Sequence, residues 1–219
     1  MSWHVPLDCD DVLPHHCEMP LQNRVQPTGD ILAHPARGAF MGNRGILHDN
    51  NKSLGSARWR HKAWVCCVTE FKNCKRILMA PNHYTELFFH DEAVALAAGH
   101  RPCGECRRAD YRAFLNAAGH SGSVKDFDVS LHAARAIPRV FKQNRHEADL
   151  KDLPDGTFIQ SCAGPALLWQ DALYPFQPNG YLAATPRPTG TVTVLTPKPT
   201  LQALWNGYRP RVSKDLGGS

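Results

Sequence analysis

The sequence predicts an α+β fold, in which a zinc-bearing α/β domain is followed by a small β-rich C-terminal part. Three observations lead to this prediction. β-Branched and aromatic residues gather at 64–71, as in a strand. Two alanine-containing segments that end in glycine follow at 92–99 and 105–119, as in helices. Short β-like runs separated by proline and glycine then fill residues 153–195.

By these patterns the chain divides into four segments. Residues 1–57 contain many prolines and glycines and no helix-period pattern, so we expect an irregular N-terminal arm or loop region. A zinc-binding α/β core is expected over 58–150, and a β-rich part over 151–211. The small and polar residues of 212–219 predict a disordered tail.

The core is expected to begin with strands. The β-rich run at 64–71 is followed by a turn at 72–73 and by a return strand at 76–79, which Pro81 ends. A further short strand is expected within 84–89. Three more strands are expected in the C-terminal part, at 157–160, 166–169 and 191–195.

Helices are expected to follow the first strands. Asp91 is a typical N-cap residue for a helix over 92–98, and Gly99 stands where a left-handed residue ends a helix. A second helix is expected from 105 to 118, with Gly119 at its end. Further helices are expected at 125–136 and 201–206.

The composition is that of an ordinary globular protein, with 42% hydrophobic and 21% charged residues in a chain of 219. No apolar run approaches the roughly 20 residues that a membrane helix needs. Residues 1–6 have neither the basic nor the apolar region of a signal peptide. We therefore expect a cytoplasmic protein without a membrane partner. The net charge of +5 and the pI of about 8.8 favour an anionic partner.

Eight cysteines in a chain without an export signal favour metal binding or thiol chemistry over a disulfide framework. Cys103 and Cys106 stand three residues apart, and the intervening Gly104 allows a tight turn that directs both thiolates at one point. Such a pair, the cysteine knuckle, is half of a tetrahedral zinc site. The start of a helix and the adjacent Arg101 and Arg107 favour the thiolate form. A redox pair or two buried thiols are the alternatives.

The remaining zinc ligands have to come from elsewhere in the chain. Cys67 is the first candidate, followed by Cys66 and Cys74. Because successive strand residues face opposite sides, Cys66 and Cys67 cannot both reach one ion from a regular strand. Across a two-residue hairpin loop, Cys67 and Cys74 would lie roughly 10–13 Å apart, so one ion takes both only if a bulge intervenes. Histidines that can complete the set are His48, His61 and His100. A second site is conceivable among Cys9, His15, His16 and Cys17.

Residues 90–108 resemble the second half of the zinc domain of Ada-type DNA alkylation-repair proteins. In that family a helix that ends in Ala-Gly-aromatic-Arg-Pro leads into Cys-x-x-Cys-Arg, and here the corresponding run is Ala-Gly-His-Arg-Pro-Cys-Gly-Glu-Cys-Arg at 98–107. Four cysteines of the family bind zinc, one of them accepts a methyl group from DNA phosphotriesters, and the domain binds DNA. The resemblance implies zinc and DNA for this chain. The family's first cysteine pair has no counterpart at the same spacing, so no methyl acceptor is assigned.

Basic residues gather in three places, near 58–62, at 101–112 and at 135–146. On the second predicted helix they form a stripe beside the knuckle, which suits phosphate groups. Trp59 and Trp64 lie within the first group and can stack on bases. Solvated faces and core tryptophans are the alternative. The residues that we expect to contact nucleic acid are Arg58, Arg60, Lys62, Arg101, Arg107, Arg108 and Arg112.

Four residues are candidates for catalysis. Glu86 stands in an apolar neighbourhood, where a carboxylate can act as general acid or base. His83 is close to it in sequence, and Asn43 and His48 in the early loop can supply a second group. No Walker loop, nucleophile elbow or H-E-x-x-H sequence is present. His90-Asp91-Glu92 and the knuckle together match the H-x-E and P-C-x-x-C parts of the deaminase signature. The interval between Glu92 and Pro102 is, however, too short for the strand that usually separates the two helices of a deaminase site.

The leading hypothesis is a zinc-stabilised DNA-binding protein that acts on damaged or modified DNA, as a DNA-repair hydrolase or glycosylase if it is an enzyme. One alternative is a non-catalytic zinc-stabilised module that binds nucleic acid or protein. Another is a zinc hydrolase or deaminase of a small molecule, which requires an open position on the metal. A Glu86→Gln substitution separates the first two, because it abolishes turnover only in the first.

Overall fold

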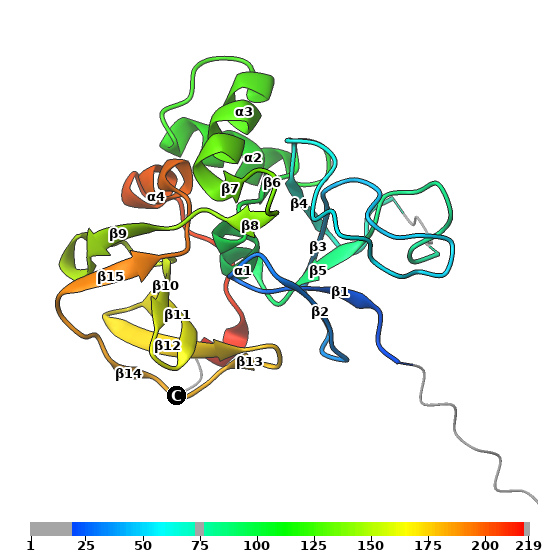
Figure 1. The fold of residues 1–219 in the computed structure, drawn as a ribbon. Coiled ribbons are helices and arrows are strands. Elements are labelled where there is room, and N and C mark those ends of the chain that lie inside the picture. The colour runs from blue at the N-terminus through cyan, green and yellow to red at the C-terminus, as the bar shows by residue number, and fades with distance from the viewer. Residues whose placement is uncertain (1–18, 73–76, 217–219) are drawn as a thin grey trace, which may run out of the picture.

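The computed structural model describes residues 19–72 and 77–216 (Figure 1). Its first sheet has six strands in the order β2-β1-β5-β3-β4-β6. The pairs β1–β5 and β4–β6 are parallel, and the other neighbours are antiparallel. The six strands are β1 (Gln22–Val25), β2 (Ile31–Ala33), β3 (Phe40–Asn43), β4 (Val65–Val68), β5 (Leu87–Phe89) and β6 (Arg101–Pro102).

Three of these strands lie in the segment 1–57, so the prediction of an irregular arm was wrong for its described part. The reason is visible in β1, whose two buried positions are Asn23 and Val25. Because one buried residue is polar, the alternation of apolar and polar residues that marks a strand is absent. Pairing with β2 and β5 stabilises this short strand instead.

The second sheet has seven strands in the order β13-β12-β11-β10-β15-β9, with β14 paired to β12. A two-residue turn with positive φ at Gln170 (48°) and Asp171 (60°) joins β11 to β12, as a tight hairpin requires. The strands predicted at 157–160, 166–169 and 191–195 are confirmed within two residues at either end. The strands are β9 (His146–Asp149), β10 (Phe158–Ser161), β11 (Gly164–Trp169), β12 (Ala172–Gln177), β13 (Gly180–Tyr181), β14 (Thr185–Pro186) and β15 (Thr191–Val194).

Helix α1 (Glu92–Ala97) is buried along its whole length. The predicted caps are confirmed, since Asp91 accepts a hydrogen bond from the backbone N–H of Val94 and Gly99 has φ of +84°. No described helix is long and apolar enough to cross a membrane. The other elements are α2 (Arg108–Ala117), α3 (Val124–Arg135), α4 (Lys198–Trp205), the 3-10 turns η1 (Leu150–Asp152) and η2 (Lys214–Leu216), and a small ribbon of β7 (Ala136–Ile137) and β8 (Lys142–Gln143).

The two hydrophobic clusters of the core each draw residues from both sides of position 150. One cluster contains Phe89 and Phe158, and the other contains Phe114 and Leu168. Helix α1 contributes to both clusters and lies at the centre of the molecule (Figure 1). The predicted zinc-bearing and β-rich parts therefore share one buried helix instead of having a separate core each.

Two local predictions need correction. The return strand expected at 76–79 is absent from its described residues, because Met79 has φ of +52°, which a strand does not allow. The tail expected to be disordered is ordered as far as 216. There the backbone N–H of Ser213 donates to Asp91 Oδ2 at 3.0 Å, and Leu216 is buried. Residues 217–219 lie outside the described part.

Candidate metal centre and a basic cavity

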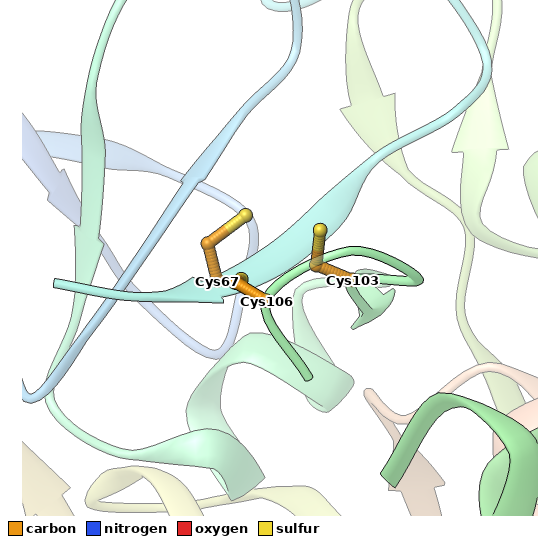
Figure 2. Close-up of side chains that lie close together, drawn as sticks. All are labelled: Cys67, Cys103 and Cys106. Carbon is orange, nitrogen blue, oxygen red and sulfur yellow. The ribbon is translucent and has the colours of Figure 1, made fainter. Parts of the chain in front are cut away.

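Three cysteine sulfurs meet between the first sheet and the loop that leads into α2. Cys67 projects from β4, and Cys103 and Cys106 come from the knuckle after β6 (Figure 2). The three Sγ atoms lie within 4.8 Å of one another, close enough to hold one metal ion. The predicted ligands Cys67, Cys103 and Cys106 are therefore brought together by the fold.

The parallel pairing of β4 with β6 brings the knuckle to the strand. Cys66 stands opposite Pro102 in this ladder, and the backbone N–H of Cys103 donates to the carbonyl oxygen of Cys66 at 3.0 Å. The knuckle then closes as the backbone N–H of Arg107 donates to the Cys103 carbonyl oxygen at 3.1 Å. This turn occupies 103–107, which is why α2 begins three residues later than the sequence predicts.

The three thiols differ in the direction in which their pKa values are shifted. A hydrogen bond from the Cys67 thiol, with further ones from backbone N–H groups, lowers the pKa of Cys103 to about 5. Donation of that hydrogen bond, together with burial, raises the pKa of Cys67, and burial raises that of Cys106. Of the three thiols, Cys103 is therefore the one that most readily becomes a thiolate. A bound metal ion would take the place of the remaining protons.

Cys66 faces away from this cluster, so its prediction as a metal ligand was wrong. Its side chain is fully buried, its Sγ accepts a hydrogen bond from Arg107 Nη1 at 3.3 Å, and burial raises its pKa. Strand alternation places Cys66 and Cys67 on opposite sides of β4, as the sequence argument required. Cys74 lies outside the described residues, as do Cys9, His15, His16 and Cys17. None of the candidate histidines joins the described cluster: His48, His61 and His100.

Two of the arginines expected to contact nucleic acid are buried and paired within the protein. Arg101 donates from Nε and Nη2 to the two carboxylate oxygens of Asp128, both at 2.7 Å. Arg107 pairs with Glu92 at 2.7 Å and with Asp110 at 2.8 Å. Both predictions are corrected, because guanidinium groups engaged in this way do not reach a phosphate. Their role is to fix the two ends of the knuckle segment.

The other predicted nucleic-acid contacts remain accessible. Arg108 and Arg112 are exposed and four residues apart on α2, so they share one face of the helix. Arg60 and Lys62 are exposed on the loop before β4, and Arg58 is half-buried there.

The predicted catalytic residues each have a hydrogen-bond partner of their own. The buried Glu86 carboxylate accepts a hydrogen bond from the Met79 backbone N–H at 2.8 Å. His48 contacts the Thr85 hydroxyl at 2.7 Å and the Ala80 carbonyl oxygen at 3.3 Å. Both side chains thus brace the turn at 79–80.

The two other catalytic candidates also have local partners. His83 is exposed, and its Nδ1 lies 3.0 Å from the Pro81 carbonyl oxygen. Asn43 is the last residue of β3, and its Oδ1 lies 3.0 Å from His61 Nε2. The sequence brings reactive residue types close together along the chain, but the fold uses them in separate hydrogen bonds.

A cavity of about 430 Å³ lies where the β1–β2 turn, the loop before β4, the end of α3 and the β7–β8 ribbon meet. Asp30 is the carboxylate that lines it. Its basic lining residues are Arg44, Arg58, Arg135, Lys142 and Arg145, and its aromatic ones are Trp59, Trp64 and Phe141. Sequence reasoning noted the basic group at 135–146 but missed this cavity, because Arg44 and Gly29 adjoin strands that it did not predict.

Two of these arginines are almost inaccessible to solvent. Arg44 and Arg135 are each 1% exposed, and their Cζ atoms lie 4.3 and 3.8 Å from the ring centre of Trp64. Burial lowers the pKa of Arg44 to about 9 and that of Arg135 well below its ordinary value. Neither forms an ion pair with a described carboxylate.

Comparisons with protein-family models, curated proteins and solved structures find no match to this chain. The thiol cluster and the basic cavity are therefore the observations from which a function is argued.

Proposed function

We propose that the protein is a zinc-stabilised DNA-binding protein that acts on damaged or modified DNA. The observation that carries this proposal is the cluster of Cys67, Cys103 and Cys106. Thiolate sulfur is a soft ligand, and tetrahedral sites rich in cysteine are typical of structural zinc. The lowered pKa of Cys103, which has a hydrogen bond from the Cys67 thiol as its first cause, favours the thiolate that binds a metal cation.

A structural zinc site needs a fourth ligand. Cys74 is the remaining cysteine among the ligands predicted from the sequence. Lys72, two residues before it, forms an ion pair with Glu105 of the knuckle at 3.3 Å, so the chain approaches the cluster at this point. A fourth cysteine closes the site and makes zinc a structural ion. A water molecule in that position instead favours a zinc hydrolase or deaminase of a small molecule.

The DNA part of the proposal is supported by charge and by the resemblance of 90–108 to the Ada-type zinc domain. Arg108 and Arg112 present two cations on one face of α2, directly after the knuckle. Arg60 and Lys62 add two more on the loop before β4. Exposed cations in such groups contact phosphates without regard to base sequence.

One observation favours a second candidate, a non-catalytic zinc-stabilised module that binds nucleic acid. Glu86 and His48, which a hydrolase or glycosylase would use, are both engaged with the turn at 79–80. Because the Glu86 carboxylate accepts a hydrogen bond from the Met79 backbone, a structural role accounts for its burial.

The zinc site is tested by the metal content of the purified full-length chain. We expect one zinc per chain in the wild type, and loss of both zinc and fold in Cys67→Ser, Cys103→Ser and Cys106→Ser. Cys162→Ser is the matched control, because Cys162 is exposed and outside the cluster. The same measurement on Cys74→Ser shows whether that residue is the fourth ligand. A wild-type protein that is folded without metal would contradict the proposal.

DNA binding is tested by titration with intact and alkylated duplexes at several salt concentrations. We expect the Arg108→Ala/Arg112→Ala double variant to bind both duplexes more weakly. Its salt slope should fall by about 2, roughly one unit for each phosphate that is no longer neutralised. Lys125→Ala, an exposed change on α3, serves as control. Equal affinity of the double variant and the wild type would exclude α2 from the interface.

A further inference from the structure

The basic cavity defined above has an unbalanced charge. Five cationic side chains line it, and Asp30 is the lining carboxylate. That carboxylate is exposed, accepts a hydrogen bond from the Thr28 hydroxyl at 2.6 Å and forms no ion pair with a described cation of the lining, so a single negative charge faces five positive ones. Charges buried without a partner are costly, and proteins keep them mainly where a ligand or a function uses them.

Arg44 is the clearest case. Its Nη1 donates to the carbonyl oxygen of Gly29 at 3.1 Å, and its Nε to His100 Nε2 at 3.3 Å. Its Nη2 atom is buried, has no hydrogen-bond partner among the described residues, and belongs to a residue of the cavity wall. Both partners of Arg44 are neutral, since burial and the nearby guanidinium groups lower the pKa of His100 well below its ordinary value. One donor of a buried cation is therefore left for a group that enters the cavity.

Arg135 stands beside Arg44 in the same wall and is held in the same way. Its donors reach the carbonyl oxygens of Gly99 and Lys62, and its guanidinium lies on the ring of Trp64. Neutral carbonyl groups orient the two guanidiniums without cancelling their charge. Two cations fixed in this manner are a pre-organised site for an anion.

The remaining lining describes the rest of the ligand. Trp59 and Phe141 are half-buried, and their ring centres lie 4.8 Å apart at the cavity. Aromatic side chains at such a site stack on planar bases. The volume of about 430 Å³ is within the range of pockets that enclose a small organic ligand. Lys142 and Arg145 are exposed and add positive charge at the opening.

We propose that this cavity binds a phosphate-bearing nucleotide, with the phosphate at Arg44 and Arg135 and the base against Trp59 and Phe141. The nucleotide is either free in solution or displaced from a DNA strand. A nucleotide displaced from DNA requires the proposed function. Binding of a free nucleotide does not, because it is inferred from the lining of the cavity alone.

The proposal is tested by calorimetric titration of the zinc-loaded full chain. The titrants are deoxynucleoside 5′-monophosphates, the matching nucleosides, inorganic phosphate and a short single strand. We expect the monophosphates to bind and the nucleosides, which lack the phosphate, to bind at least roughly tenfold more weakly. Arg44→Met, which keeps an unbranched side chain in this buried position and removes its charge, is expected to weaken monophosphate binding by roughly 10- to 100-fold.

A second variant keeps the test decisive if Arg44→Met does not fold. Lys142→Ala changes an exposed residue at the opening and is expected to weaken monophosphate binding several-fold. Lys125→Ala removes the same charge from the exposed face of α3 and is expected to bind as the wild type does. Trp59 fluorescence, with Trp59→Phe as reference, reports whether the ligand reaches the aromatic wall.

The outcomes separate this inference from the proposed function. Binding of monophosphates without binding of DNA supports the cavity and overturns the DNA-binding proposal. Tighter binding of the strand than of the monophosphate, abolished in Arg44→Met, supports a nucleotide displaced from DNA. DNA binding that is equal in the wild type, Arg44→Met and Lys142→Ala, with no binding of monophosphate or phosphate, overturns the inference and leaves the α2 interface intact.

Discussion

Replacement of Arg101 by alanine separates a structural from a nucleic-acid role for the knuckle segment. The side chains of Arg101 and Asp128 are 7% and 6% exposed and share two hydrogen bonds of 2.7 Å. The pair connects β6, which leads into the cysteine knuckle, to α3. Arg101→Ala removes the guanidinium and leaves the Asp128 carboxylate buried without its partner.

The expected cost follows from that burial. Breaking a buried ion pair by removing one partner typically costs about 3–5 kcal/mol, against a total stability of about 5–15 kcal/mol. For a chain of this size each kcal/mol corresponds to about 2–4 °C, so the melting temperature should fall by about 6–20 °C. Arg112→Ala, an exposed change on α2, should stay within about 0.5 kcal/mol of the wild type.

Thermal unfolding of the purified protein, followed by circular dichroism, measures both variants. The double variant Arg101→Met/Asp128→Leu should recover most of the stability, because no charge is then left unpaired. In DNA titrations Arg112→Ala should change the salt dependence of the affinity, and Arg101→Ala should not. The reasoning is refuted if Arg101→Ala melts at the wild-type temperature and weakens DNA binding as Arg112→Ala does.

Three further predictions concern single residues. Cys66→Ser should retain one zinc per chain by elemental analysis, since Cys66 bonds to Arg107 and not to the cluster; loss of zinc would contradict the assignment of Cys67. Glu86→Gln should lower the melting temperature without changing DNA affinity, because Glu86 holds the Met79 backbone; any turnover that this variant abolishes would instead make Glu86 catalytic. Burial and the nearby Arg135 lower the pKa of His132 from 6.5 to about 4. As the pH drops from about 6.5 to 4, the unfolded state therefore takes up a proton before the folded state does, and the free energy of unfolding should decrease. Urea titrations measure this, and a His132→Gln variant that keeps the full pH dependence would contradict it.

Local signals predicted the centre of the molecule well. Asp91, Gly99 and the run between them specify α1 through its capping groups, which depend only on neighbours in sequence. The spacing of Cys103 and Cys106 likewise predicted a turn that gathers two thiols, and strand alternation predicted that Cys66 and Cys67 do not both reach one ion. These inferences worked because the chemistry lies within one turn or one strand.

Long-range partners were beyond the reach of the sequence. Arg101 and Arg107 look like phosphate contacts because the acids that bury them in ion pairs, Asp128 and Glu92, are separated from them along the chain, although Arg107 also pairs with the nearby Asp110. Strand β1 was missed because one of its buried residues is an asparagine. The cavity around Arg44 depends on segments far apart in sequence, so charge clusters within one segment could not reveal it.

The acids at the start of α1 set an order of events for the synthesis of the protein. Asp91 accepts from the Ser213 backbone, and Glu92 accepts from the Tyr208 hydroxyl and the Arg211 backbone, over separations of 116 to 122 residues. At ordinary elongation rates a ribosome needs roughly 6–24 s to add that length of chain. During this interval Asp91 and Glu92 have their nearby partners, Val94 and Arg107, but lack the downstream ones. The hydrogen bonds that enclose the start of α1 are therefore complete only after the downstream segment has emerged.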